Sequence, residues 1–206
     1  MEISRLEVGK TKSISTEKVR TIIKNYCISK GVNMGKQGFS HESSKNKSVE
    51  WYTPRYIFEA IGITFDLDPC SPGKDVVPWI PAIKHLTVED NGLMAEWNGN
   101  VWLNPPYGTN TSAWLSRLAM HKKGIALLFC RPDTNWFHKY VKSADLICLV
   151  KGRIQFVNED FAEEYAKRKY KPKKSCGAAS MLIAYGKENA KALKNSGLGL
   201  SLAVIE

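Results

Sequence analysis

The sequence predicts an α/β protein with a mostly parallel, twisted β-sheet that is covered by helices on both faces. Short apolar segments bounded by turn residues alternate along the chain with segments of helical period. Several of the apolar segments, such as 125–129 and 146–150, are hydrophobic at every position. Strands of this kind are buried on both faces, as they are in parallel sheets. A chain of 206 residues, 43% of them hydrophobic, can bury a full core around such a sheet.

The elements of this domain follow from turn residues and from the spacing of apolar residues. The first helix is predicted at 54–61, with Thr53 as its N-cap, Pro54 at the first helical position and Gly62 just after its end. Apolar or alternating segments predict the strands, and helical spacing predicts two further helices. The strands are expected at 63–68, 83–87, 101–103, 125–129, 146–150, 154–157, 178–185 and 200–205, and the helices at 110–121 and 134–141.

Residues 1–48 are predicted to form a basic extension that precedes the domain at 49–206. Apolar residues at helical spacing predict a short amphipathic helix at 16–29. The segment at 31–48 is rich in Gly, Ser and Lys, which is typical of a flexible linker. The helix either docks on the domain or contacts DNA, and the sequence leaves both alternatives open.

Basic residues are concentrated toward the two ends of the chain. The net charge is +10, and by segment it is +5 for residues 1–50, −1 for 51–130 and +6 for 131–206. A near-neutral centre between basic flanks suits an enzyme that acts on a polyanion. A basic protein without such a substrate has the same balance, so charge alone does not decide between them.

A basic run lies in a predicted insertion at 158–175, between the strands at 154–157 and 178–185. Six of the eight residues at 167–174 are basic, and one is aromatic. Such a run near a strand end would contact phosphates and make binding sensitive to salt, whereas the alternative is a solvated loop. The predicted DNA contacts in the run are Lys167, Arg168, Lys169, Lys171, Lys173 and Lys174.

The five cysteines are predicted to be reduced thiols. Their number is odd, no two form a Cys-x-x-Cys pair, and three lie in or beside apolar runs. This pattern argues against a disulfide framework and against a zinc or other metal site. No apolar run approaches the roughly 18 residues of a membrane span, and the N-terminus lacks a secretion signal. The protein is therefore expected to be soluble and intracellular, without a membrane partner.

The segment Asn104-Pro105-Pro106-Tyr107 follows the predicted strand at 101–103. Neither proline has an N–H, so the strand cannot continue its hydrogen-bond ladder and is expected to end in a rigid loop. In open α/β sheets, ligands bind at this carboxyl end of the strands. The loop offers a carboxamide oxygen from Asn104, the peptide carbonyl of Pro105 and the aromatic face of Tyr107.

These groups suit the methylation of an exocyclic amine on a base. The lone pair of adenine N6 is delocalised into the ring, so this amine is a poor nucleophile. The Asn104 side chain and the Pro105 carbonyl could bind both N–H groups and stabilise the positive charge that develops as the amine attacks a methyl sulfonium. Tyr107 would stack on a base removed from its duplex. The alternative is a Pro-Pro turn after a core strand.

An acid ends the first predicted strand of the domain. The strand at 63–68 alternates and then breaks at Asp68 and Pro69. An acid in this place is well positioned for the ammonium or hydroxyl groups of a cofactor. The alternative is an Asx turn or a helix cap before the proline.

Together these residues resemble the phage-type DNA N-6-adenine methyltransferase family, the Dam-like phage enzymes. The resemblance covers roughly residues 50–186 and does not include the first fifty. Its motifs occur in the order that the family has. They are Trp51-x-Thr53-Pro54, Asp66-x-Asp68-Pro69-Cys70, Asp90-Asn91-Gly92-Leu93 followed by Trp97, Asn104-Pro105-Pro106-Tyr107-Gly108 followed by Trp114, Arg131-Pro132-Asp133-Thr134-x-Trp136-Phe137, and Gly152-Arg153-Ile154-x-Phe156.

The resemblance implies a Rossmann-like class I methyltransferase fold and the transfer of a methyl group from S-adenosylmethionine (AdoMet) to adenine N6 in DNA, with S-adenosylhomocysteine as product. The DNA would be double-stranded with a flipped adenine, and the enzyme would work in the cytoplasm of a bacterial host. Residues 104–107 would form the catalytic loop, with Phe156 as a second aromatic against the base and Arg153 as a further DNA contact. The residues implied to bind the cofactor are Trp51, Thr53 and Pro54 beside it, Asp68, Pro69 and Cys70 at its methionine or ribose part, and Asp90 at its adenine amino group.

The chain departs from the broader methyltransferase pattern after the first strand. Residues 68–73 read Asp-Pro-Cys-Ser-Pro-Gly in place of a Gly-x-Gly loop. The group that anchors the cofactor carboxylate is therefore unassigned, and Asp75 is a candidate for the ribose hydroxyls. A nucleotide-binding oxidoreductase is disfavoured because the Gly-x-Gly-x-x-Gly fingerprint is missing. The open alternatives are AdoMet-dependent methylation of an RNA base or a protein amide, and an inactive DNA-binding protein that kept the fold.

Overall fold

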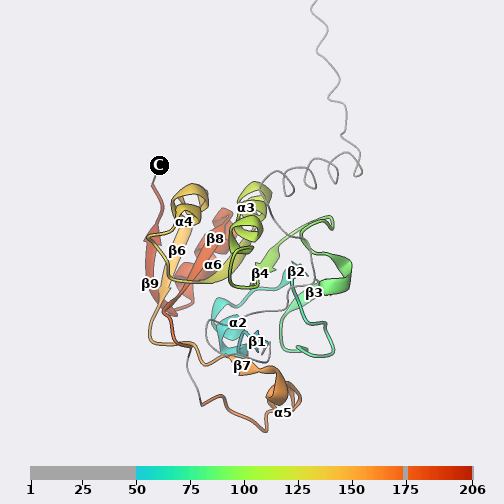
Figure 1. Cartoon of the computed structure of the whole chain (residues 1–206). Coiled ribbons are helices and arrows are strands. Elements are labelled where there is room, and N and C mark those ends of the chain that lie inside the picture. Colours follow the sequence, from blue (N-terminus) through green and yellow to red (C-terminus); the bar gives the residue numbers. More distant parts are fainter. Residues whose placement is uncertain (1–49, 174–175, 206) are drawn as a thin grey trace, which may run out of the picture. The chain divides into compact units, whose positions relative to one another are not determined.

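The computed structural model describes residues 50–173 and 176–205 (Figure 1). The predicted extension at 1–48, with its helix and linker, lies outside the described residues. The centre of the described part is a seven-stranded sheet with the strand order β3-β2-β4-β5-β8-β6-β9. The expectation of an α/β protein is confirmed.

Four neighbouring strands of the sheet run parallel to one another. They are β2 (Phe65–Asp68), β3 (Ala82–His85), β4 (Val101–Leu103) and β5 (Gly124–Phe129). From β2 the chain goes to β3 on one side and then returns to β4 on the other side of β2. The strand order therefore reverses between β2 and β4. The carboxyl ends of these two strands flank a crevice of the kind in which α/β sheets bind ligands.

The other three strands differ in direction. β6 (Leu146–Val150) runs the same way as the parallel four, but β8 (Ser180–Tyr185) lies antiparallel between β5 and β6. β9 (Gly199–Ala203) pairs antiparallel with β6 at the edge. Five of the seven strands of the described sheet thus share one direction, and the expectation of a mostly parallel sheet misses β8 and β9. Because β6 and β8 are antiparallel neighbours, β8 starts at the edge where β6 ends.

Helices cover both faces of the sheet, as the sequence predicts. Successive residues of β4 point to opposite faces, so Trp102 belongs to one core cluster while Val101 and Leu103 belong to the other. The face of Trp102 is covered by α2 (Arg55–Ile61) and α6 (Lys187–Asn195), and the opposite face by α3 (Thr111–His121) and α4 (Asn135–Tyr140).

A two-stranded antiparallel ribbon lies outside this sheet. It consists of β1 (Trp51–Tyr52) and β7 (Val157–Asn158), which Figure 1 shows next to each other with the short helix α5 (Ala162–Ala166) close by. The ribbon joins the start of the domain to the start of the basic insertion. The 3₁₀ turns of the described residues are η1 (Val88–Asp90), η2 (Val141–Ser143) and η3 (Glu159–Phe161).

The predicted strand at 154–157 is wrong. Only Val157 and Asn158 pair with another strand, and their partner is β1 rather than the main sheet. The alternation is real, because Ile154 and Phe156 are buried in the core while Arg153 is exposed. It reflects one-sided packing of an irregular segment, which a sequence pattern cannot distinguish from a strand.

Two expectations about helices also need correction. The N-cap of α2 is Pro54 and not Thr53, so the helix starts one residue later than predicted. Helix α6 was not predicted, because its polar sequence buries only Asn189 and Leu193. Among the described helices, none combines the length and the apolar character that crossing a membrane requires.

Candidate active site

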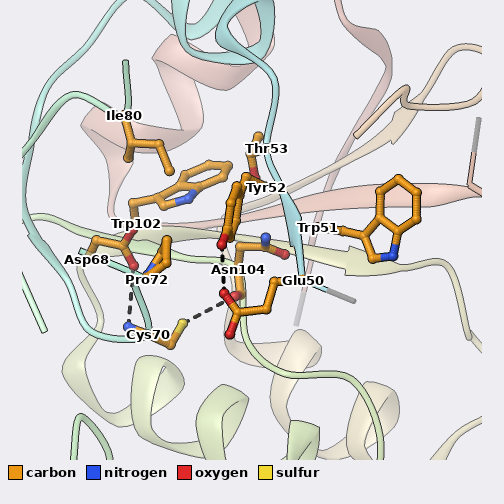
Figure 2. Close-up of a pocket in the computed structure, with 10 residues that line it drawn as sticks. All are labelled: Glu50, Trp51, Tyr52, Thr53, Asp68, Cys70, Pro72, Ile80, Trp102 and Asn104. Atoms are coloured by element: carbon orange, nitrogen blue, oxygen red, sulfur yellow. Dashed lines mark hydrogen bonds between the residues drawn. The ribbon is translucent and has the colours of Figure 1, made fainter. Parts of the chain in front are cut away.

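A pocket opens where the strand order reverses, at the carboxyl ends of β2 and β4 (Figure 2). Its empty volume is about 300 Å³, which includes space open to solvent. The pocket brings together residues that sequence analysis selected from three separate motifs. It is lined by Glu50, Trp51, Tyr52, Thr53, Asp68, Cys70, Pro72, Ile80, Trp102 and Asn104.

Asp68, the last residue of β2, is a buried carboxyl group in this pocket. It is 3% exposed, and its Oδ1 accepts a hydrogen bond from the Cys70 backbone N–H at 3.3 Å. The nearest cationic candidate is His85, whose Nδ1 lies 3.9 Å from Asp68 Oδ2, too far for a hydrogen bond. Burial raises the pKa of Asp68 to about 7, and the Cys70 hydrogen bond offsets this only in part.

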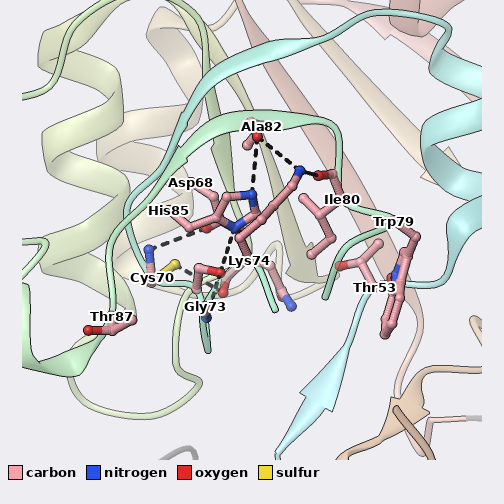
Figure 3. Close-up of polar contacts among 12 residues, drawn as sticks. Thr53, Asp68, Cys70, Gly73, Lys74, Trp79, Ile80, Ala82, His85 and Thr87 are labelled. Atoms are coloured by element: carbon pink, nitrogen blue, oxygen red, sulfur yellow. Dashed lines mark hydrogen bonds and ion pairs between the residues drawn. The ribbon is translucent and has the colours of Figure 1, made fainter. Parts of the chain in front are cut away.

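The surroundings of His85 favour the neutral form of its imidazole (Figure 3). Its Nε2 donates to the carbonyl of Ala82 at 3.1 Å, and its Nδ1 accepts from the Ser71 hydroxyl at 2.8 Å. Burial and the positive charge of Lys74 lower the pKa of His85. A neutral ring gives Asp68 no compensating charge, so the acid is suited to a positively charged group of a ligand.

Asn104, the residue after β4, has a free side-chain acceptor. Its backbone carbonyl accepts a hydrogen bond from the Cys70 thiol at 3.2 Å. Its Oδ1 is buried and has no hydrogen-bond partner within residues 50–173 and 176–205. The loop after it is fixed to helix α3, because the Thr111 hydroxyl donates to the Pro106 carbonyl at 3.2 Å. The backbone around Asn104 is therefore held in place, and its side-chain oxygen can accept an N–H group from a ligand.

Tyr107 stacks on a ring that sequence analysis missed. The rings of Tyr107 and Phe129 are 4.0 Å apart at an interplanar angle of 16°. Burial raises the pKa of the Tyr107 hydroxyl, so it stays protonated. Phe129 ends β5, the neighbour of β4, so the pairing follows from strand order, which the sequence does not contain. The ring of Phe129 therefore occupies one face of Tyr107.

Two further polar atoms of the pocket have no partner among the described residues: Thr53 Oγ1 and Trp102 Nε1. Thr53 was predicted to border a cofactor, whereas Trp102 was assigned only to a core strand. Both residues are fully buried. Of these two residues, only Thr53 could be selected from the sequence, because it belongs to the motif Trp51-x-Thr53-Pro54.

Asp90 and Phe156 do not line the pocket. Asp90 is exposed in η1, where its Oδ2 accepts from the backbone N–H and the hydroxyl of Thr87 at 2.8 and 3.0 Å. These hydrogen bonds lower the pKa of Asp90. Phe156 is 4% exposed and packs in the core beside α2. Their functional roles stay predictions. Pro54 and Pro69 are buried next to residues of the pocket.

The basic insertion is tied to the wall of the pocket. The backbone N–H of Arg55 donates to the Tyr165 hydroxyl at 2.8 Å, and the Tyr165 ring lies 4.9 Å from the ring of Trp79. Trp79 in turn donates to the carbonyl of Thr53 at 2.8 Å. The predicted DNA contacts Lys167, Arg168, Lys169, Lys171, Lys173 and Arg153 are exposed, and Lys174 lies outside the described residues.

The described cysteines carry free thiols; they are Cys70, Cys130, Cys148 and Cys176. In the part of the chain that the structure describes, no group of three or more His, Cys, Asp or Glu side chains is arranged to hold a metal ion.

Comparison with known proteins gives one match. A family model described as DNA N-6-adenine-methyltransferase (Dam) matches residues 40–183. No curated protein and no solved structure matches the chain significantly. The matched range contains every residue that lines the pocket, the loop at 104–107 and the basic insertion.

Proposed function

Because the chain belongs to the DNA N-6-adenine-methyltransferase (Dam) family, we propose that it transfers a methyl group from AdoMet to N6 of adenine in DNA. The observation that carries this proposal is the buried Asn104 oxygen, an acceptor without a partner among the described residues that shares a pocket with Asp68. We also propose that the α/β fold is a Rossmann-like class I methyltransferase fold. The ligand crevice between the ends of β2 and β4 supports this assignment.

The polar groups of the pocket fit the methyl donor. AdoMet has an ammonium group, a carboxylate, ribose hydroxyls and an adenine. The buried carboxylate of Asp68 has no close cationic partner in the described part of the chain and suits the ammonium group, while Trp51 and Ile80 offer apolar wall. When bound, AdoMet supplies an electrophilic methyl group on a sulfonium centre. Thr53 and Cys70 border the same space.

Asn104 acts on the amine in this proposal. An N6 hydrogen of the target adenine donates to Asn104 Oδ1, and the Pro105 carbonyl accepts the other. These acceptors stabilise the positive charge that grows on N6 as the nitrogen–carbon bond forms and the carbon–sulfur bond breaks. One N6 hydrogen then leaves as a proton to water. Because the loop is anchored through Pro106 and Thr111, the acceptor is positioned before the reaction.

The DNA would approach the same edge of the sheet. β6 ends and β8 begins at the carboxyl edge, so the insertion between them starts and finishes near the pocket. Its exposed lysines would contact phosphates, and a flipped adenine would stack on Tyr107 on the side away from Phe129. A double-stranded substrate with one base flipped out is part of the proposal.

The test is transfer of labelled methyl from AdoMet to unmethylated DNA, followed by nucleoside analysis of the product. A matched duplex of guanine and cytosine only is the control substrate. We expect N6-methyladenine in the adenine-containing DNA and no label in the control. Binding of AdoMet without labelled DNA would contradict the proposal and favour an RNA base or a protein amide as acceptor. Failure to bind AdoMet would indicate a DNA-binding protein that kept the fold.

A further inference from the structure

Three buried polar atoms around the pocket lack a hydrogen-bond partner in the described residues: Asn104 Oδ1, Thr53 Oγ1 and Trp102 Nε1. Folded proteins pair nearly all of their buried polar groups, so each exception calls for an explanation. The proposed reaction explains Asn104. It does not explain Thr53 and Trp102, which can both donate a hydrogen bond.

The indole of Trp102 is held so that its N–H cannot turn to another partner. The side chain is fully buried, and its ring packs against Phe58 and Phe65 with centroids 4.6 and 5.5 Å away. In Figure 2 the indole nitrogen lies on the ring edge turned toward Pro72. By contrast, the indole nitrogens of two other buried tryptophans donate to carbonyls at 2.8 Å; they are Trp79, to Thr53, and Trp97, to Gly92.

The hydroxyl of Thr53 is also left for a ligand. Thr53 precedes the N-cap Pro54, and its side chain does not cap helix α2. Its backbone carbonyl is taken by the Trp79 indole, which fixes the backbone at this position. The side chain is fully buried in the pocket wall. The pocket thus contains two rigid donors without an acceptor.

The described part of the pocket lacks a positive charge to pair with the carboxylate of Asp68. Among residues 50–173 and 176–205, no cation pairs closely with Asp68: His85 lies 3.9 Å away and has a lowered pKa, and Lys74 donates to the carbonyls of Ile80 and Ala82 at 3.1 and 3.2 Å. An acid without a cation and two donors without an acceptor form the complement of a zwitterion. An α-amino acid has both required groups, an ammonium and a carboxylate on neighbouring atoms.

We propose that the Trp102 N–H and the Thr53 hydroxyl bind the carboxylate at the α-amino-acid end of the methyl donor, while Asp68 faces its ammonium group. This inference rests on the proposed function and assigns the carboxylate anchor that the sequence leaves open. Trp102 is then a ligand-binding residue as well as a core residue of β4.

The test compares two ligands in the whole chain by titration calorimetry. S-adenosylhomocysteine has the amino-acid end, and 5′-methylthioadenosine lacks it. Thr53→Val removes the hydroxyl at nearly constant shape. At Trp102 the benzothienyl analogue of tryptophan replaces N–H by sulfur, and the same analogue at Trp97, on the opposite face of the sheet, is the matched control.

Each change at Thr53 or Trp102 is expected to weaken S-adenosylhomocysteine binding by roughly ten- to a hundredfold, since it removes a hydrogen bond to a charged group. The same changes should alter binding of 5′-methylthioadenosine by no more than about twofold, because this ligand has no carboxylate. The Trp97 control should bind both ligands within about twofold of the unaltered chain, because it keeps the hydrogen bonds to the carboxylate. Equal losses for both ligands, or no loss for either, would overturn the assignment while leaving the proposed function intact. An unaltered chain that binds neither ligand would instead overturn the proposed function.

Discussion

Polar side chains have hydrogen-bond partners at the amino ends of strands β2 and β4, whereas key polar groups at the carboxyl ends lack partners among the described residues. At the amino end, Asp66 accepts a hydrogen bond from the Asn100 backbone N–H at 2.5 Å. The Asn100 side chain donates to the Thr64 carbonyl at 3.2 Å and accepts from the Asn189 side chain at 2.8 Å. At the carboxyl end, two residues further along β2, Asp68 is buried with no close cation among the residues that the structure describes.

Asn104 differs from Asn100 in the same way. The Asn100 carboxamide uses both its oxygen and its nitrogen, whereas the Asn104 oxygen has no partner in the described part of the chain. Paired groups stabilise a fold, and unpaired buried groups cost stability unless a ligand completes them. The polar groups at the amino end therefore contribute to stability, and those at the carboxyl end are available for ligand binding.

The largest expected effect on ligand binding separates the two acids of β2. Asp68→Asn should weaken binding of S-adenosylhomocysteine roughly a hundredfold, because it removes a buried charge opposite the ligand's ammonium group. Asp66→Asn, the matched change at the other end, should leave binding unchanged. Titration calorimetry of both variants decides the point. Similar losses in the two variants would remove the distinction between the ends.

The titration of Asp68 should make stability depend on pH. Its pKa is about 7 in the folded protein, above the value of about 3.9 for an unfolded chain. Between these values the unfolded chain binds fewer protons, so stability falls as pH rises from 4 to 7. Relative to Asp68→Asn, the ligand-free protein should lose roughly 2–4 kcal/mol over this range. Urea unfolding at several pH values measures the difference, and parallel curves for the two proteins would contradict the prediction.

Lysines at the two edges should differ in their contribution to DNA binding. Neutralising Lys169 and Lys171 by glutamine should weaken DNA binding roughly 10- to 50-fold and reduce the slope of log K against log salt by about 1.8. The control neutralises Lys122 and Lys123, which are exposed next to the amino end of β5. Fluorescence anisotropy across salt concentrations measures both pairs. Equal slopes for the two double variants would exclude the insertion from the interface.

The smallest effect concerns the amino end alone. Gly99 has φ +70, and a Cβ there would lie 2.1 Å from the Asp66 carboxylate. Gly99→Ala should therefore lower the free energy of unfolding by about 1–2 kcal/mol without changing ligand affinity. Gly62→Ala is the control, because Gly62 has the same φ but nothing within 4 Å of its Cβ. Equal losses for both would show that the backbone, and not the Asp66 contact, sets the cost.

The sequence was most informative where apolar runs and prolines coincide. The strands at 101–103 and 146–150 match the structure residue for residue, since each is fully apolar and bounded by polar residues. The loop after 101–103 was predicted at the ligand-binding edge because its two prolines end the strand there. Of the residues predicted for the cofactor and the catalytic loop, five line one pocket: Trp51, Thr53, Asp68, Cys70 and Asn104. The predicted cofactor residues Pro54, Pro69 and Asp90 do not line it.

What the sequence could not supply are pairings between distant segments. Phe129 reaches Tyr107 only because β5 lies beside β4, and β7 pairs with β1 across more than a hundred residues. In the sequence Trp102 looks like an ordinary core residue of an apolar strand. Only the structure reveals that its N–H has no partner among the described residues. Motif reasoning cannot find such an atom, because its signal is a missing contact.

The role of Asn104 as the catalytic acceptor is tested most directly by comparing the two asparagines that flank β4. Methyl transfer to DNA and thermal unfolding are measured for Asn104→Ala and Asn100→Ala. We expect Asn104→Ala to lose roughly 10²- to 10³-fold in transfer rate and to stay stable, because a preorganised acceptor is removed. Asn100→Ala should lose about 1–3 kcal/mol of stability and keep its transfer rate per folded molecule. Undiminished transfer by Asn104→Ala would contradict the central claim.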